Sequence, residues 1–421
     1  MYKRQAKIRP YLCRLKNGIL KDYFYFLKGN FRTVGFGWVL TLLSGFGQTF
    51  LISLYVPEII RSFQISEGAF GAIYAGCTIA ASFIMLSVGH TVDHKPVKKV
   101  TAYTVAGLAL SSILLGLSQN ILLLILAITG LRLAGQGLLT HISMTIMSKQ
   151  FVADRGKALS FSSLGFSVGE ALFPLLIAFL ISWFDWRVAA ITSGCVLLLY
   201  LIRLKFNRLE NFDEKLSRDG SPSPWSLLKD YKTVVFDRRF GVMMPASFIL
   251  SFSATAIFFY QYVFVENKGW SVQLYATFFT VYAITRFLFS LFGGVWVDKF
   301  TARKLFRYYL IPVNIGLLPF AFMDGILGAL IFLITAGITM GVSGTVKTAL
   351  IAELYGTGKM GVIRSVFTMF SVISTALGPL VVGLLMDAGV SFEYIMAGIF
   401  VLMALIILNS QRIKTYQTTP S

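Results

Sequence analysis

Residues 89–99 read Gly-His-Thr-Val-Asp-His-Lys-Pro-Val-Lys-Lys, and residues 294–304 read Gly-Val-Trp-Val-Asp-Lys-Phe-Thr-Ala-Arg-Lys. In each stretch a glycine precedes an aspartate by four residues, and a pair of basic residues follows. The two stretches are offset by 205 residues, and Pro174 and Pro379 keep the same offset. Because the offset is constant across separate segments, it predicts two similar halves in one chain.

The composition around these stretches is that of a membrane protein. Apolar residues make up 56% of the chain and charged residues 14%, whereas soluble proteins carry about 25% charge. Several apolar blocks exceed the ~18 residues that indicate a spanning helix, and they lack the alternation of a β-barrel. The pattern predicts an all-α membrane protein with twelve transmembrane helices, at approximately residues 34–56, 70–90, 99–118, 120–147, 157–183, 186–204, 240–265, 271–297, 304–323, 325–351, 361–386 and 391–410.

The basic residues predict the orientation of these spans. The net charge is +19, and most Lys and Arg fall in loops that share one face if the N-terminus is inside. Because cytoplasmic loops are enriched in Lys and Arg, we expect both termini in the cytoplasm and the protein in the inner (plasma) membrane. This distribution argues against nucleic-acid binding. The expected parts are a basic tail (1–32), a six-helix bundle (33–204), a cytoplasmic linker (205–239), a second bundle (240–410) and a C-terminal tail (411–421).

The basic tail has two open interpretations. It mixes Lys and Arg with Tyr and Phe, which is typical of an interfacial helix on a membrane leaflet. A solvated basic tail explains the same composition.

The paired stretches resemble the motif between the second and third helices of the major facilitator superfamily and its degenerate second copy. Arg132-Leu-Ala-Gly-Gln-Gly137 resembles the superfamily's fourth-helix motif. The resemblance covers residues 33–410 and implies two pseudo-symmetric six-helix bundles that carry a solute by alternating access. The chain departs from the family at Pro96, where the motif usually has Gly, and in the fifth helix. There the antiporter motif is reduced to Gly165-x-x-x-Gly169-Glu170-x-x-x-Pro174, which weakens an assignment to drug efflux. The stretch Gly45-x-Gly-Gln48-Thr-Phe with Gly169-Glu170-Ala resembles a bacterial subgroup of largely unassigned substrate.

The motif chemistry predicts a cytoplasmic gate. An aspartate at a helix C-terminus is unfavourable alone and needs a cation or another helix's N-terminus. The resemblance places helix 11 beside Asp93, and the repeat predicts a mirror contact of Asp298 with the start of helix 5. The candidate gate residues are Gly89, Asp93, Lys98, Lys99, Gly294, Asp298, Arg303, Arg364 and Arg155. The alternative is that these residues only anchor the topology.

Ionisable residues deep in a span cost roughly 2.5–3.5 kcal/mol on insertion scales, so they are functional candidates. Arg132, Glu170 and Arg286 lie deepest, and Lys347 lies nearer a span end. Polar residues at helical spacing predict a wet face beside them. The candidate substrate-binding residues are Arg132, Gln136, Arg286, Tyr282, Gln48, Lys347 and Ser343.

Three cations against one carboxylate predict an anionic substrate, because guanidinium groups bind carboxylate or phosphate with two hydrogen bonds. The alternative is that Arg132 and Arg286 pair with Glu170 or cap carbonyls structurally. Glu170 is the candidate proton-coupling residue, and a permanent Arg–Glu ion pair is its alternative.

The sequence therefore predicts a secondary active transporter, a symporter or antiporter, for a small, negatively charged organic solute. We expect the partners to be the solute, protons and the bilayer, with the protein acting as a monomer. The three cysteines, Cys13, Cys77 and Cys195, have no metal or disulfide spacing. The chain also lacks a nucleotide-binding loop, which argues against ATP-driven transport. It has no convincing catalytic constellation, so we expect neither enzyme activity nor a cofactor. The competing interpretations are proton-driven efflux of hydrophobic compounds and a membrane-embedded enzyme or sensor.

Overall fold

The computed structural model describes residues 8–88, 95–151, 154–206, 232–355 and 360–415 of the 421-residue chain. In these residues all regular secondary structure is helical. Eleven helices are long and apolar enough to cross a membrane, and a bent helix pair supplies a twelfth span. The prediction of an all-α membrane protein with twelve spans is confirmed.

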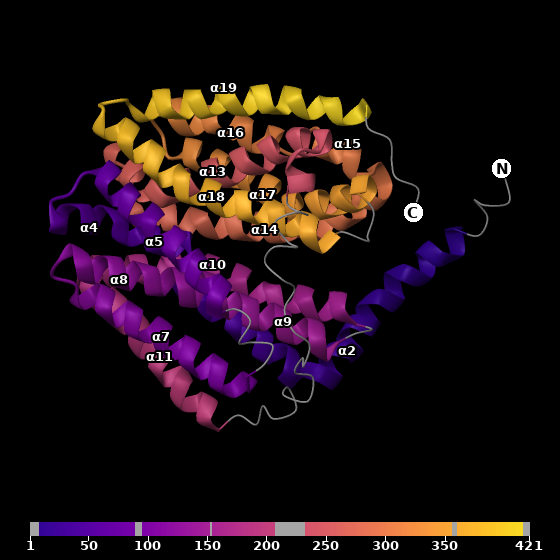
Figure 1. Ribbon diagram of the computed structural model, residues 1–421, viewed down its shortest axis with the longest axis horizontal. Helices are drawn as coiled ribbons and strands as arrows, with labels where there is room; N and C mark the ends of the chain where they lie inside the picture. The colour runs from indigo at the N-terminus through magenta and orange to yellow at the C-terminus, as the bar shows by residue number, and fades with distance from the viewer. Residues whose placement is uncertain (1–7, 89–94, 152–153, 207–231, 356–359, 416–421) are drawn as a thin grey trace.

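The helices form two halves on either side of the central linker. The first half contains α2 (Ile8–Ser44), η1 (Gly45–Gly47), α3 (Thr49–Ile52), η2 (Ser53–Tyr55), α4 (Val56–Phe63), α5 (Glu67–Val88), α7 (Val97–Leu117), α8 (Ile121–Leu131), the π-helix η3 (Arg132–Leu139), α9 (Thr140–Gln150), α10 (Arg155–Trp183) and α11 (Trp186–Lys205). The second half contains α13 (Arg238–Asn267), α14 (Val272–Phe300), α15 (Ala302–Phe306), α16 (Ile311–Phe322), α17 (Leu327–Tyr355), α18 (Met360–Asp387), α19 (Phe392–Ser410) and η5 (Gln411–Thr415). Figure 1 shows the halves as two separate layers, indigo to magenta below and orange to yellow above.

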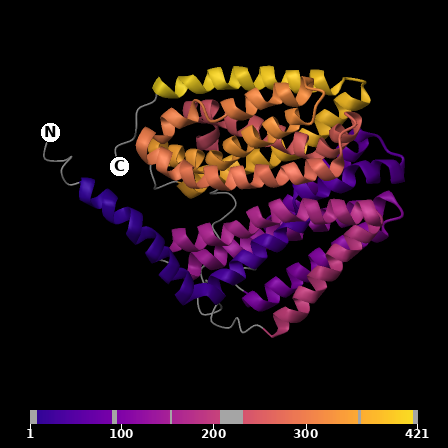
Figure 2. The same ribbon diagram turned by 180° about the vertical axis from the view of Figure 1, so that it is seen from behind.

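The halves meet chiefly along two helix pairs, α5 with α18 and α10 with α14. We call the end at which α11 finishes and α13 begins the linker end, and the opposite end, where α18 finishes, the Asp387 end. The layers lie close together at the Asp387 end and diverge toward the linker end, in Figure 1 and in the reverse view of Figure 2. The two layers are therefore joined more closely at one end than at the other.

The first span is broken in its middle. The segments 25–47 and 49–63 meet at an angle of 42°, and Gln48 between them is extended, with φ −87° and ψ 153°. The expectation of one continuous helix over residues 34–56 is therefore wrong in this region. Gly45 and Gly47 flank the break at positions without room for a side chain, because an added Cβ would lie 2.9 Å from the Phe173 ring at Gly45 and closer still to the carbonyl oxygen of Leu131 at Gly47.

The N-terminal arm, residues 8–30, and the start of the first span belong to one kinked helix, α2. α2 begins at Ile8 and continues to Ser44, with a non-helical residue at Asn30 (φ −122°, ψ 15°). The arm and the first span meet at this kink, which lies close to the predicted division at residue 33. Whether this arm lies on a membrane surface remains a prediction.

Candidate functional site

Glu170 and Arg286 form an ion pair between the two halves. Glu170 lies in the middle of α10 and Arg286 in the middle of α14. Nη1 of Arg286 donates to Oε1 of Glu170 at 2.7 Å and to Oε2 at 2.9 Å. The Glu170 side chain is 4% exposed, whereas that of Arg286 is 27% exposed. A buried carboxylate is costly unless it is paired, so this contact stabilises Glu170 and joins the halves near the centre of the spans.

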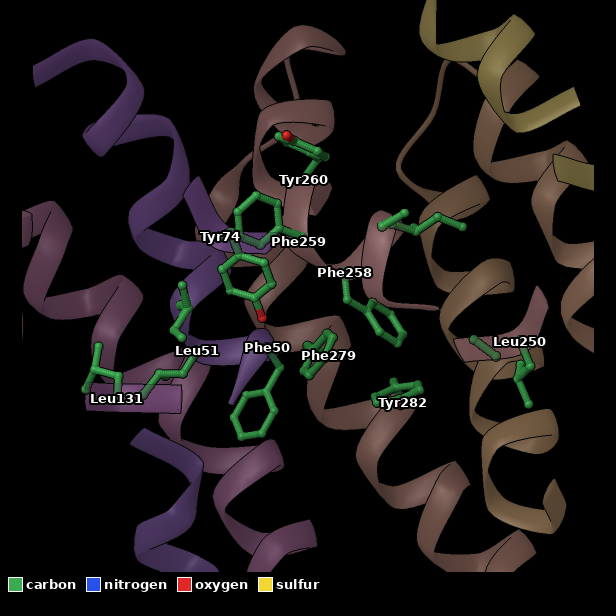
Figure 3. Packing of buried hydrophobic residues seen from close by; sticks show 14 of the residues in the cluster. Phe50, Leu51, Tyr74, Leu131, Leu250, Phe258, Phe259, Tyr260, Phe279 and Tyr282 are labelled. Carbon is green, nitrogen blue, oxygen red and sulfur yellow. The ribbon is translucent and has the colours of Figure 1, made fainter. Parts of the chain in front are cut away.

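Aromatic side chains pack around this ion pair. The Arg286 guanidinium lies 5.0 Å from the centre of the Phe166 ring. Phe50 of the broken first span contacts Phe166 and Phe279, with ring centroids 5.8 and 6.3 Å apart. Figure 3 shows Phe50, Phe279 and Tyr282 side by side where the two halves meet. One ring thus contacts Arg286 directly, and rings from both halves pack beyond it.

Arg132 is buried on the other side of the first-span segment. It begins the π-helix η3 and is 2% exposed. Its Nη1 donates to Oγ1 of Thr49 at 3.2 Å and to the Gly47 carbonyl at 3.5 Å. The guanidinium lies 4.9 Å from the centre of the Tyr74 ring, and the Tyr74 hydroxyl is 2.8 Å from Oγ1 of Thr49. Arg132 therefore secures the break in the first span.

Two nitrogens of Arg132 have no hydrogen-bond partner among the residues that the structure describes. Nε and Nη2 are both buried and unsatisfied. These two nitrogens share one edge of the guanidinium plane, and that edge can donate two parallel hydrogen bonds to a carboxylate or phosphate. No carboxylate contacts this guanidinium among the described residues. The geometry thus leaves a charged, two-pronged donor without an anion.

Two glycines bring the break and the π-helix into contact. A Cβ added to Gly135 would lie 2.6 Å from Cα and 2.7 Å from N of Gly47. A Cβ added to Gly47 would lie 2.8 Å from Cα of Gly135. The two backbones can touch only because both residues lack a side chain, and this contact places Arg132 against Gly47 and Thr49. Irregular π-helical turns of this kind are frequent at functional sites.

The remaining predicted substrate-binding residues lie in three places. Gln48 occupies the first-span break and is 8% exposed, and Gln136 lies half-buried in the π-helix beside Gly135. Tyr282 is buried, packs on Phe258 and Phe279, and interacts with Arg286. Ser343 and Lys347 lie on α17, where Ser343 donates to the carbonyl of Met340 at 3.1 Å. The structure brings Gln48 and Gln136 to Arg132 and brings Tyr282 to Arg286, but it describes no contact of the α17 pair with either guanidinium.

Most of the predicted gate falls outside the part of the chain that the structure describes. Gly89 and Asp93 are not described, and neither are the side chains of Arg155, Asp298 and Arg364. Gly294 lies within α14. Of the basic residues, Lys98 donates from Nζ to the carbonyl of Lys205 at 2.8 Å, Lys99 is exposed and Arg303 is half-buried in α15. The gate therefore remains a prediction.

The sequence did not single out Thr49 and Tyr74 as partners of Arg132. Their one signal is the run Gly45-Phe-Gly-Gln-Thr49, in which two glycines interrupt an apolar span. Tyr74 carries no separate signal, because an aromatic residue inside a span is ordinary.

Two cavities, of about 250 and 220 Å³, lie at the Asp387 end. The larger is lined by Glu67, Asn267 and Phe392 among others, and the smaller by Glu58, Tyr262 and Glu266 among others. Neither cavity borders Arg132 or Arg286. In this conformation, both cavities are thus separate from the mid-span charges.

Comparison with known proteins gives a family match along the spans. The profile of the Major Facilitator Superfamily matches residues 37–379 and 243–415. The "Uncharacterized transporter YybO" of Bacillus subtilis (strain 168) is 28% identical over 170 residues. That match covers 39% of this chain and 39% of YybO, so it spans well under two thirds of that relative.

Solved structures share the architecture at low sequence identity. A bacterial homologue of the human lysosomal transporter Spinster, in an inward-facing and unoccupied conformation, matches with a TM-score of 0.73 at 14% identity. The match covers 93% of this chain and 98% of that one. The nucleoside transporter NupG matches with a TM-score of 0.73 at 12% identity, covering 91% of this chain and 100% of NupG. At these identities the matches establish the fold alone.

Proposed function

The chain belongs to the Major Facilitator Superfamily, and from this membership we propose that it carries a small organic anion across the membrane by alternating access. The observation that carries the choice of an anion is the uncompensated positive charge of Arg132, whose Nε and Nη2 have no partner in the described part of the chain. An isolated buried charge is strongly unfavourable. A bound carboxylate or phosphate would supply both the counter-charge and the missing hydrogen-bond acceptors.

The other charged residues within the spans also favour an anionic substrate. Glu170 neutralises Arg286, so Arg132 and Lys347 remain as excess cations. Arg286 keeps an exposed fraction of 27%, so part of its side chain stays accessible while Glu170 holds one nitrogen. The two guanidinium groups lie on either side of α3. Thr49 of α3 accepts a hydrogen bond from Arg132, and Phe50 of α3 contacts the Phe166 ring on which Arg286 lies.

Access to Arg132 requires movement of the first span. In this conformation Arg132 is closed in by Thr49, Gly47 and Tyr74. The break at Gly45–Gln48 separates α2 from α3, so α3 can shift without displacing α2. We propose that substrate binds when this shift uncovers the free edge of the guanidinium.

Glu170 is our candidate for proton coupling. Its ion pair spans the two halves, so separation of α10 from α14 would remove its partner. A carboxyl group left unpaired in apolar surroundings favours its neutral, protonated form. A proton taken up at this step would couple the movement of the halves to the proton gradient. Efflux of hydrophobic compounds needs a carboxylate that the substrate can reach, and Arg286 occupies this one.

The test is thermal unfolding of the purified protein in detergent with a defined set of solutes. The set contains lactate, succinate, gluconate and inorganic phosphate as anions, with glucose and tetraphenylphosphonium as the uncharged and cationic probes. We expect saturable stabilisation by one anion class. Because a charge-assisted hydrogen bond contributes about 1.5–3 kcal/mol, Arg132→Lys should weaken the affinity at least ~10-fold, and Arg132→Gln should abolish binding.

The matched control is Arg203→Gln, which removes an exposed arginine at the end of α11 and should leave the affinity unchanged. Stabilisation by glucose or tetraphenylphosphonium alone would contradict an anionic substrate. Full anion affinity in Arg132→Gln would remove Arg132 from the site.

A further inference from the structure

The end of α18 carries a third copy of the spacing Gly-x-x-x-Asp. Gly383-Leu-Leu-Met-Asp387 places a glycine four residues before an aspartate at a helix C-terminus, as Gly294 and Asp298 do at the end of α14. Gly89 and Asp93 have the same spacing in the sequence. This copy does not follow from the internal repeat, because the corresponding residues of the first half are Ala178 and Ser182. It also lies at the opposite end of the spans, at the Asp387 end.

Asp387 binds the N-terminus of a helix in the other half. Its Oδ2 accepts a hydrogen bond from Oγ of Ser66 at 2.6 Å, and its Oδ1 accepts from the backbone N–H of Gly68 at 3.1 Å. Oγ of Ser66 in turn accepts from the N–H of Ala69 at 3.1 Å. A carboxylate is stabilised by the unpaired N–H groups and the dipole at a helix N-terminus and is unfavourable at a C-terminus. The N-terminus of α5 therefore supplies the hydrogen-bond donors and the favourable dipole that the C-terminus of α18 cannot give to Asp387.

Glycines allow the two helices to approach this closely. A Cβ added to Gly383 would lie 2.6 Å from the carbonyl oxygen of Glu67, and one added to Gly68 would lie 3.0 Å from Cγ of Asp387. Tyr260 of α13 closes the crossing from the side, since its hydroxyl donates to the carbonyls of Glu67 at 2.5 Å and Pro379 at 3.1 Å. The glycine four residues before the aspartate thus has a clear steric purpose.

We propose that Asp387 is a functional residue of the transport cycle, a latch that holds the Asp387 end closed. The proposal rests on the alternating-access part of the proposed function and is independent of the substrate. α5 and α18 run antiparallel, so that Asp387 at the end of α18 lies against the N-terminus of α5. Asp387 makes this contact at one end in the present conformation, and Asp93 is predicted to make it at the linker end. When the halves rock, one contact forms as the other breaks.

The second pair of helices lacks such a latch at this end in the described residues. The start of α14 is capped by its own Ser271, whose Oγ accepts from the N–H of Leu274 at 3.3 Å. Near the end of α10, Ser182 donates to the carbonyl of Phe179. Arg61 also joins the halves here through Glu266, but its side chain is 57% exposed, and exposed ion pairs contribute little. Closure at this end therefore depends on the α5–α18 crossing together with the buried hydrogen bond that Nε2 of Gln261 donates to Oγ of Ser53 at 2.8 Å, which also joins the halves.

The test measures the separation of the halves by double electron–electron resonance. Spin labels are placed at Gln119→Cys and Asn267→Cys, exposed positions of the two halves at the Asp387 end, in a chain carrying Cys13→Ser, Cys77→Ser and Cys195→Ser. We expect Asp387→Ala to raise the ratio of long to short distances at least ~10-fold, which corresponds to the loss of about 1.4 kcal/mol. Ser66→Ala should shift the ratio in the same direction by less.

The matched control is Asp324→Asn, an exposed carboxylate of the second half at the same end, which should leave the distances unchanged. Adding Asp93→Asn to Asp387→Ala should return the ratio toward that of the starting chain, a rescue that a merely misfolded protein would not show. Distances in Asp387→Ala that match the starting chain would overturn the proposal, as would an equal shift in Asp324→Asn. Because no substrate enters the measurement, its outcome is separate from the test of anion binding.

Discussion

At the scale of single residues, the sequence locates the mid-span charges and offers an Arg–Glu pair as one alternative, but it does not decide which arginine pairs with Glu170. Arg132, Glu170 and Arg286 stand out because each interrupts an apolar block. The partner of Glu170 is 116 residues away in the other half, and no local pattern encodes such a pairing. In this conformation Arg286 pairs with Glu170, whereas Arg132 has no counter-ion among the described residues.

The ion pair predicts a non-additive effect of mutation. Glu170→Gln or Arg286→Gln alone leaves a partner charge without its counter-ion, which costs 3–5 kcal/mol for a fully buried pair. We expect about 2 kcal/mol here, because Arg286 is partly exposed and water can screen it. The double variant Glu170→Gln/Arg286→Gln should recover most of this loss, since two amides can hydrogen-bond each other.

A double-mutant cycle on thermal unfolding in detergent measures the coupling. Losses in the single variants that simply add in the double variant would show that the two side chains do not act as a pair.

At the scale of the helices, hydropathy predicts the number of spans and misses the break in the first. The count depends only on local apolar length, so twelve spans could be found from the sequence. Glycine is common inside transmembrane helices, so Gly45 and Gly47 did not predict a break. Its position depends on the π-helix at Arg132–Leu139, which contacts Gly47 through Gly135, a contact between distant parts of the chain.

This contact predicts which glycines tolerate a methyl group. Gly135→Ala would place Cβ 2.6 Å from Cα of Gly47, and Gly47→Ala would place it 2.8 Å from Cα of Gly135. Such overpacking costs roughly 1–3 kcal/mol or more, and here it also moves the backbone that holds Arg132. We expect both variants to unfold at a lower temperature and to lose anion affinity.

Gly107→Ala in α7 is the matched control, because no atom lies within 4 Å of its added Cβ. Alanine favours a helix by about 1 kcal/mol over glycine, so this variant should be as stable as the starting protein or more stable. Equal tolerance at Gly47 and Gly107 would contradict the close contact.

At the scale of the whole molecule, charge separates along the spans. The described basic residues gather at the linker end, among them Lys98, Lys99, Arg203, Lys205, Arg238, Arg239, Arg303 and Lys304. The Asp387 end has Arg61, Arg187 and Lys268 beside a larger set of carboxylates, namely Glu58, Glu67, Asp185, Glu266, Asp324, Asp387 and Glu393. The repeat motifs and this asymmetry are both visible in the sequence, but the closed Asp387 end depends on contacts between halves that the sequence alone did not reveal.

The asymmetry predicts the orientation of the protein in the membrane. Lys and Arg near span ends are retained on the cytoplasmic side, where the anionic leaflet attracts them, so we expect the linker end inside the cell. Alkaline phosphatase fused after Ser421 should then be inactive, and the same enzyme inserted at Gly325, between α16 and α17, should be active, because it folds only outside the cytoplasm. A green fluorescent protein at the two positions should report the reverse pattern. Active phosphatase at the C-terminus would invert the topology, and the Asp387 latch would then close the cytoplasmic rather than the external side of the transporter.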